Sequence, residues 1–209
     1  MKKKKRILRA LKRRYVDVVI IFKGNEMSRI KTPAQIKDAP EASQELLGTV
    51  QNMLGSVPNM FRIISNSPAV LEGYLGLSAA ISKGKLSAAT RERIALAVAQ
   101  VNGCDYCLAA HTYLAQNVAK LNGVEIDANR AGTSTDAKAA VAVSFAVEIA
   151  RSRGQIDKDA IAVVKDAGFS DEEIVEIIGN VALNVLTNYV NEVLDTEIDF
   201  PATRLAKAA

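Results

Sequence analysis

Apolar residues recur at intervals of three and four positions from Glu41 almost to the end of the chain, a period typical of amphipathic helices. In the first such segment they fall at Leu46, Leu47, Val50 and Leu54. Short loops that contain Gly, Pro or Ser separate this segment from the following ones. No alternating run bounded by hairpin turns indicates a strand. The pattern therefore predicts an all-α chain.

Residues that commonly begin and end helices set the expected bounds. Ser67, Ser87 and Ser170 are the predicted N-caps, and glycines follow several of the segments. The expected helices cover residues 41–54, 67–82, 87–102, 104–121, 136–153, 157–167 and 170–194, with a short segment at 58–64. With 209 residues, 49% of them hydrophobic, the chain can bury one substantial core. We expect a single-domain helical bundle of roughly seven to eight helices.

The net charge of +4 is concentrated at the N-terminus. Residues 1–26 contain ten Lys or Arg and only two acidic residues, Asp17 and Glu26, so they carry a net charge of +8. The remaining residues include 17 basic and 21 acidic ones, a net charge of −4. This mildly acidic body lacks the basic footprint of a nucleic-acid-binding domain, and we expect no nucleic-acid partner.

The N-terminal basic residues precede an apolar run, Val16 to Phe22, in the order found in secretory signals. The run is too short to cross a bilayer, and no small-residue cleavage site follows it. We therefore expect no membrane association and a cytoplasmic protein. The codons for Lys23-Gly24 resemble a bacterial ribosome-binding site ahead of Met27. We interpret residues 1–26 as a basic extension, disordered or upstream of the true start, and residues 27–209 as the helical domain. An arm that binds polyanions is the alternative.

Both cysteines and the single histidine of the chain lie between positions 104 and 111. Cys104 precedes Cys107 by three residues, and His111 follows four residues later, so one helix would carry all three on one face. Cys104 is expected in the first turn, where unpaired backbone N–H groups favour a thiolate. Histidine is the natural proton acceptor near neutral pH. The spacing predicts a redox-active thiol pair beside an imidazole.

Glu92 lies near the start of the preceding expected helix, and Asn102-Gly103 can bend the chain so that the two helices pack together. A carboxylate beside His111 would orient its ring and raise its basicity. Otherwise Glu92 is an ordinary solvated residue. The cysteines have two alternative interpretations, as buried small apolar residues or as zinc ligands with His111 and Glu92. Structural zinc usually takes four Cys or His ligands and this chain has three, so we expect no metal.

Further polar residues lie near these positions or on the last expected helix. Asn180, Asn184 and Asn188 are spaced by four and form one polar ridge. Together with Asn191, they line the pocket, seal a subunit interface or face solvent. Tyr106 is expected to pack or to face solvent, with its hydroxyl within reach of the site.

The order Glu92, eleven residues, Cys104-x-x-Cys107, three residues and His111 resembles the signature of the alkylhydroperoxidase D family. That family belongs to the carboxymuconolactone decarboxylase superfamily. The flanking residues and the chain end also resemble its peroxidase-related branch, through Leu86-Ser87-x-x-x-Arg91-Glu92-x-Ile94-x-Leu96, Asn188, Asn191 and Asp199-Phe200-Pro201. The resemblance covers about residues 28–201. Tyr106 departs from it, because well-studied members often have histidine there, and this leaves substrate preference and rate open.

The resemblance implies a helical fold that assembles into trimers or hexamers. It implies that Cys107 attacks a hydroperoxide and becomes a sulfenic acid, that Cys104 resolves it to a disulfide, and that Glu92 and His111 relay the proton. We expect no bound cofactor, and the resemblance implies that an external dithiol on a lipoyl-bearing or thioredoxin-like protein reduces the Cys104–Cys107 disulfide. The alternatives are a thiol–disulfide exchange protein or redox sensor with little peroxidase turnover, and a decarboxylase-like lyase.

Overall fold

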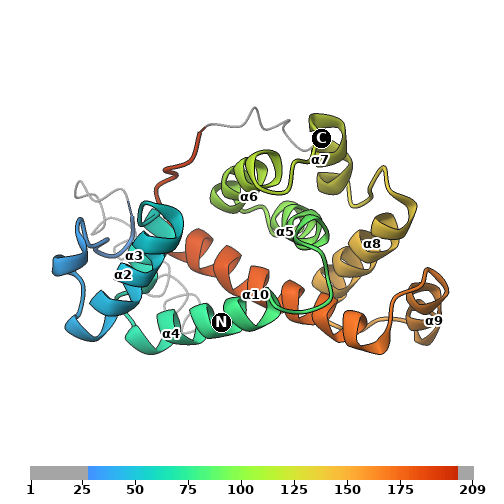
Figure 1. Cartoon of the computed structure of the whole chain (residues 1–209), viewed down its shortest axis with the longest axis horizontal. Coiled ribbons are helices and arrows are strands. Elements are labelled where there is room, and N and C mark those ends of the chain that lie inside the picture. The colour runs from blue at the N-terminus through green and yellow to red at the C-terminus, as the bar shows by residue number, and fades with distance from the viewer. Residues whose placement is uncertain (1–27, 202–209) are drawn as a thin grey trace, which may run out of the picture.

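The structure is a computed structural model that describes residues 28–201, and these residues form helices joined by short loops with no strand among them. The elements in chain order are a short 3₁₀ helix and nine α-helices: η1 (Ile36–Asp38), α2 (Glu41–Leu54), α3 (Asn59–Ile64), α4 (Pro68–Ile81), α5 (Ala88–Asn102), α6 (Asp105–Asn117), α7 (Gly123–Arg130), α8 (Ala137–Ser152), α9 (Lys158–Asp166) and α10 (Asp171–Leu194). The predicted all-α class is confirmed (Figure 1). The extension predicted for residues 1–26 lies outside the described residues.

The described residues contain one or two more α-helices than predicted, and the helix that the sequence did not predict is α7. The helix expected over residues 104–121 would end just before Asn122, but the side chain of Asn122 caps α7 and accepts a hydrogen bond from the backbone N–H of Glu125 at 2.9 Å. The preceding helix ends at Asn117 and not near residue 121. The chain turns there through Lys120, whose φ is 58°. No glycine marks this turn, so the sequence contains no stop signal at the true end.

The predicted N-caps are confirmed. The side-chain oxygens of Ser67, Ser87 and Ser170 each accept a backbone N–H of the first turn that follows, which satisfies one of the unpaired donors there. Ser170 forms a full capping box with Glu173. Gly103 ends α5 in the left-handed conformation, with φ of 68°, and lets α6 begin two residues later.

The centre of the fold is α5. Six consecutive residues of this helix, Ile94 to Ala99, are buried, so every face of its middle two turns is covered. The helices that cover it are α6, α7, α8 and α10, which surround it in Figure 1. Alanines at three of the six positions let these neighbours approach closely. The placement of α6 and α10 against α5 creates the site described below.

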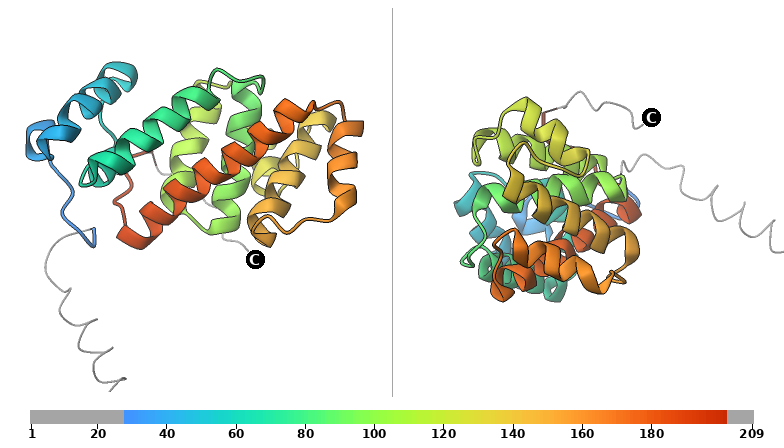
Figure 2. Two further views of the ribbon diagram at one scale, coloured as in Figure 1. Left: turned by 90° about the horizontal axis from the view of Figure 1, so that it is seen from below. Right: turned by 90° about the vertical axis from the view of Figure 1, so that its right-hand side faces the viewer.

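The longest helix is α10, whose 24 residues extend over about 36 Å at 1.5 Å per residue. Its N-terminal half packs against α8, where Ile174 contacts the cluster that contains Phe145. Its C-terminal half runs alongside α4 (Figure 2), and Val190 joins the cluster that contains both cysteines. In residues 28–201 no helix combines the length and the apolar character needed to cross a bilayer.

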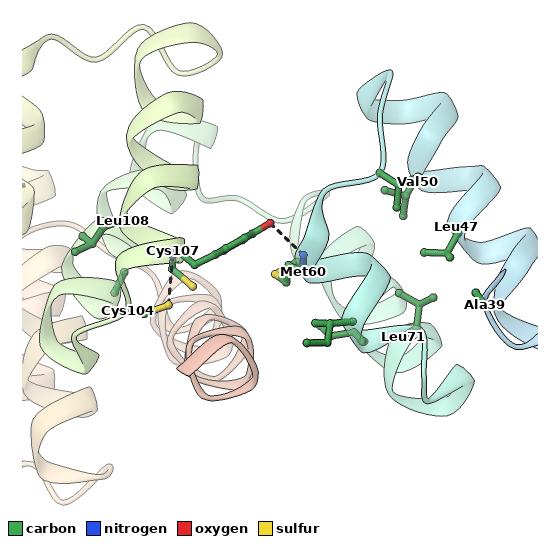
Figure 3. Packing of buried hydrophobic residues seen from close by; sticks show 13 residues of the cluster. Ala39, Leu47, Val50, Met60, Leu71, Cys104, Cys107 and Leu108 are labelled. Atoms are coloured by element: carbon green, nitrogen blue, oxygen red, sulfur yellow. Dashed lines mark hydrogen bonds between the residues drawn. The ribbon is translucent and has the colours of Figure 1, made fainter. Parts of the chain in front are cut away.

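The cysteines belong to an apolar cluster that spans the molecule from α2 to α6. Leu47 and Val50 of α2 and Leu71 of α4 form one side of the cluster, and Cys104 and Cys107 lie at the other side (Figure 3). Cys104 is 0% exposed and Cys107 is 2% exposed. The local environment of the thiol pair is therefore apolar and shielded from bulk water.

A buried carboxylate joins the N-terminal half of α5 to α7 and to the loop before α8. Glu125 is 3% exposed and accepts hydrogen bonds from Arg93 Nε at 2.6 Å, Asn129 Nδ2 at 2.8 Å, Ser134 Oγ at 2.6 Å and the backbone N–H of Thr135 at 2.7 Å. Burial raises the pKa of Glu125, but these hydrogen bonds outweigh it and hold the pKa well below its usual range. The carboxylate is therefore charged and stabilises this corner of the fold.

Replacement of this carboxylate tests its structural role. Glu125→Ala is expected to lower the free energy of unfolding by about 3–5 kcal/mol, because Arg93 and the other donors would stay buried without their partner. Urea denaturation followed by circular dichroism measures the change. The matched control is Glu148→Ala on the exposed side of α8, which should stay within about 0.5 kcal/mol of the parent chain. A loss below about 1 kcal/mol for Glu125→Ala would contradict this role.

Candidate functional site

Cys104 lies at the N-cap of α6, one position before the first turn in which it was predicted. Its sulfur accepts a hydrogen bond from the backbone N–H of Cys107 at 3.3 Å, which is the role that a serine oxygen has in an ordinary N-cap. Each of the two thiols shifts the pKa of the other, and both cysteines are free. Figure 3 shows both sulfurs turned toward the same side of α6. The predicted pairing of the two thiols on one face is therefore present.

The predicted carboxylate and imidazole also come together. Glu92 of α5 and His111 of α6 pair through Oε2 and Nδ1 at 2.9 Å, and both side chains are about four-fifths buried. Glu92 is therefore no solvated surface residue. Its neighbours point elsewhere, since Arg91 donates to the carbonyl of Leu86 and Arg93 pairs with Glu125.

The ion pair changes the titration of His111. Burial lowers the pKa of His111, but the charge and the hydrogen bond of Glu92 outweigh burial and raise the pKa above its usual value. The negative charge of Cys107 and a hydrogen bond with Asn184 act in the same direction. Glu92 holds Nδ1 and thereby fixes the orientation of the ring. The ring is therefore oriented and its protonated form is favoured.

The asparagines of α10 line the site, and the interpretation of a solvated helix face is wrong. Asn180, Asn184, Asn188 and Asn191 are 3%, 6%, 0% and 2% exposed. Asn191 donates from Nδ2 to the sulfur of Cys107 at 3.2 Å. The spacing of four in the sequence singled out Asn180, Asn184 and Asn188, with Asn191 beside them, but the pattern did not reveal which side of α10 faces the cysteines.

The buried side-chain amide of Asn188 is only partly hydrogen-bonded. Asn188 accepts from Asn102 Nδ2 at 2.7 Å through its oxygen, and its own Nδ2 has no partner among the described residues. A buried unpaired donor costs about 1–3 kcal/mol. The side chain of Asn188 also lowers the pKa of Cys107, which means that it favours the thiolate. A negatively charged sulfur, or an oxygen bound to it, would supply the acceptor that this amide lacks.

The two thiols differ in acidity. The hydrogen bond from Cys104 lowers the pKa of Cys107, burial opposes it, and the charge of His111 with the amides of Asn191 and Asn188 brings the pKa to about 7. The pKa of Cys104 is raised, because its thiol donates to Cys107 and because it is buried. Cys107 is therefore about half ionised near pH 7, and Cys104 stays a thiol. Only the thiolate is nucleophilic, so the lowered pKa favours the nucleophilic form of Cys107 over that of Cys104.

A cavity of about 600 Å³ opens onto Cys107. Cys107, His111 and Glu92 line it, whereas Cys104 does not. The opposite walls come from α2, α3 and α4 and are mainly apolar: Met53, Leu54, Met60, Phe61, Leu75 and Ile81. Tyr74 adds a phenol, and burial together with the negative charges of Cys107 and Glu92 raises its pKa to about 12. This cavity is the route by which a small molecule can reach the buried thiolate.

Tyr106 neither faces solvent nor touches the thiolate through its hydroxyl. The ring is 3% exposed, and the hydroxyl donates to Asp199 Oδ1 at 2.9 Å and accepts from the backbone N–H of Met60 at 3.1 Å. The sequence did not predict this link to the end of the chain. Within residues 28–201 no three His, Cys, Asp or Glu side chains converge as ligands of one metal ion.

The thiol pair of this site lies within a segment that matches a known protein family. Residues 68–152 match the model of the Carboxymuconolactone decarboxylase family, and they include Glu92, both cysteines and His111. The matched segment covers less than half of the chain, so it shows a similarity to this family in the part that carries the thiol pair. No curated protein matches it in sequence.

Several solved structures share the fold over most of the chain. An uncharacterized peroxidase-related protein from Silicibacter sp. TM1040 is 24% identical, covers 84% of this chain and 93% of its own, and has a TM-score of 0.71. An uncharacterized peroxidase-related protein from Ralstonia eutropha JMP134, described as an alkylhydroperoxidase AhpD core, is 20% identical, with coverages of 84% and 94% and a TM-score of 0.74. A variant of the debrominase Bmp8 with 2,3,4-tribromopyrrole is 23% identical, with coverages of 82% and 94% and a TM-score of 0.69.

The single histidine of the chain allows a direct test of the ion pair between Glu92 and His111. Glu92→Gln is expected to lower the pKa of His111, because the mutation removes the charge that favours the imidazolium. The chain has one histidine, so one set of imidazole resonances in an NMR pH titration reports it. The control is Glu72→Gln on the exposed side of α4, which should leave the titration unchanged. An unchanged His111 pKa in Glu92→Gln would contradict the pairing.

The acidity of Cys107 is tested by alkylation. The rate of iodoacetamide modification is expected to rise with pH through a midpoint near 7, and peptide mapping should find the label at Cys107 before Cys104. Asn191→Ala should raise the midpoint by about one pH unit, because it removes a hydrogen bond to the charged sulfur. The control is Asn117→Ala at the exposed end of α6. Equal midpoints in the parent chain and Asn191→Ala would exclude this role of the amide.

Proposed function

We propose that the protein is a thiol peroxidase that reduces hydroperoxides through Cys107. The observation that carries this proposal is the buried sulfur of Cys107, which is held by an amide donor from Asn191 and opens onto a cavity beside His111. A thiolate that is ionised near neutral pH attacks peroxides, whereas a thiol does not. The cavity is large enough for an organic hydroperoxide as well as for hydrogen peroxide.

The first step transfers one oxygen atom to sulfur. The thiolate of Cys107 attacks the terminal oxygen of the hydroperoxide, the O–O bond breaks, and an alkoxide leaves. The imidazolium of His111 gives its proton to the alkoxide, so the products are an alcohol and a sulfenic acid at Cys107. Glu92 supports this step because its charge stabilises the imidazolium that supplies the proton.

The second step forms the disulfide. Cys104 keeps its proton while Cys107 reacts, and its sulfur lies against Cys107 at the start of α6. The thiol of Cys104 then attacks the sulfenic sulfur, an S–S bond forms, and the hydroxyl leaves as water with the proton of Cys104. The raised pKa of Cys104 supports its role as the resolving thiol, because it does not compete for the peroxide.

An external dithiol must then restore both cysteines, and it becomes a disulfide itself. The net reaction converts a hydroperoxide and a dithiol into an alcohol, water and a disulfide. Both sulfurs are almost completely buried, which favours a reductant that carries its dithiol on a slender arm, such as a lipoyl group, over a broad thioredoxin-like surface. No bound cofactor takes part in these steps.

The burial of the thiol pair also weighs against the alternatives. Direct disulfide exchange with a folded protein needs an accessible sulfur, and Cys107 is 2% exposed. A decarboxylase-like lyase has no need of a sulfur with a lowered pKa.

Reductive dehalogenation of a halogenated aromatic compound is the second candidate, because aromatic residues such as Phe61 and Tyr74 line the cavity and the similar Bmp8 was solved with tribromopyrrole. Bromide release from that compound would distinguish it from peroxide reduction.

The expected trimer or hexamer is part of this proposal. Five large apolar residues project from α10 in one stripe along its outer face and are 37–67% exposed: Val175, Ile178, Leu186, Tyr189 and Val193. Continuous apolar stripes of this kind commonly mark protein–protein interfaces. Multi-angle light scattering measures the assembly, and a monomer at micromolar concentration would exclude it.

Serine substitutions at the two cysteines test the peroxidase. One equivalent of cumene hydroperoxide is expected to remove two free thiols from the parent chain and to lower its intact mass by two hydrogens. Cys104→Ser should stop at the sulfenic acid, which dimedone traps on Cys107, and Cys107→Ser should keep its remaining thiol. Circular dichroism controls for folding. Retention of both thiols in the parent chain, or equal reaction of Cys107→Ser, would refute the proposal.

A further inference from the structure

The last described residues are fastened across the molecule by one carboxylate. Asp199 accepts a hydrogen bond from the backbone N–H of Asn59 at 2.8 Å through Oδ2, and from the hydroxyl of Tyr106 at 2.9 Å through Oδ1. The same hydroxyl accepts from the backbone N–H of Met60. Asn59 Nδ2 also donates to the carbonyl of Glu197 at 3.1 Å. A segment without regular structure is thereby joined to the start of α3 and to the first turn of α6.

This fastening places an aromatic ring at the cavity. Phe200 meets Tyr106 edge to face, with ring centroids 5.7 Å apart and an interplanar angle of 90°, and lies 6.1 Å from the ring of Tyr113. All three rings line the cavity that opens onto Cys107. Tyr106 precedes Cys107 directly in the sequence. The ring of Phe200 is therefore held against the residue next to the reactive sulfur.

The size of the cavity exceeds what a small peroxide needs. A volume of about 600 Å³ compares with about 30 Å³ for one water molecule in the liquid, so hydrogen peroxide would touch few of the walls. Pockets of 300–1,000 Å³ are typical for ligands of roughly drug size. The aromatic wall can contact only a substrate with a large apolar body. The binding energy of that body is then available to hold the peroxide group at Cys107.

We propose that Phe200 is a specificity-determining residue that selects hydroperoxides with a bulky, aromatic body over hydrogen peroxide, and that Asp199 is the positioning residue that holds this ring in place through Tyr106 and Asn59. The inference rests on the proposed peroxidase function. It also assigns a role to Tyr106, because its hydroxyl is one of the two donors that bind the Asp199 carboxylate.

The test compares two substrates in each variant. Phe200→Ala is expected to lower kcat/KM for cumene hydroperoxide by about tenfold, mainly through KM, and to change kcat/KM for hydrogen peroxide by less than about twofold. Asp199→Asn should also lower the ratio of kcat/KM for cumene hydroperoxide to kcat/KM for hydrogen peroxide, by a smaller factor. Ile198→Ala is the matched control, because Ile198 is 44% exposed on the same segment and does not line this cavity. An unchanged ratio in Phe200→Ala, or an equal loss for both peroxides, overturns the inference.

A second measurement separates this inference from the proposed function. Calorimetric binding of 2-phenyl-2-propanol, the alcohol formed from cumene hydroperoxide, involves no redox chemistry and should weaken by about fivefold to tenfold in Phe200→Ala. Phe200→Leu keeps an apolar side chain on the cavity wall, so its affinity for the alcohol should lie between those of the parent chain and Phe200→Ala. This variant guards against a folding defect in the alanine variant. If the alcohol binds in a way that depends on Phe200 but no peroxide is turned over, the proposed peroxidase function is refuted and the role of Phe200 in binding is supported. If peroxide is turned over but binding of the alcohol does not depend on Phe200, only the role of Phe200 in specificity is refuted.

Discussion

The hydrogen bond from Asn191 to the sulfur of Cys107 joins the C-terminal half of α10 to the start of α6, and the candidate site depends on it. An apolar environment penalises a charged sulfur unless donors compensate for the lost water. Here the donors come from Cys104 and from amides of α10, and His111 contributes its charge. The long α10 can supply these amides because it packs on α5, the helix that also carries Glu92.

The difference between the two thiols follows from their positions on one helix. Cys104 occupies the N-cap, where its sulfur accepts a backbone N–H and its thiol donates to Cys107. Cys107 lies one turn later, and it receives the hydrogen bonds that favour a charge. A raised pKa at one sulfur and a lowered pKa at the other therefore have one common cause, the hydrogen bond between them. This asymmetry assigns nucleophilic character to the cysteine that faces the cavity.

Local signals account for the parts of the fold that were predicted. The serine caps act within one turn, so Ser67, Ser87 and Ser170 could be recognised without any knowledge of packing. The missed helix α7 has a cap of its own at Asn122, but the same residue also suits a helix end. Without knowledge of the turn at Lys120, which is specified by its surroundings and not by a glycine, the two interpretations could not be separated.

For the site, the sequence by itself determined that Cys104, Cys107 and His111 share a face, because helical periodicity is a property of the backbone. It also placed Glu92 on the preceding helix and the asparagines at a spacing of four. Only the tertiary structure decided which face of α10 meets the sulfur, how large the cavity is, and that Asp199 binds Tyr106 across 93 positions. These features depend on contacts between distant segments, and such contacts leave no periodic signal in the chain.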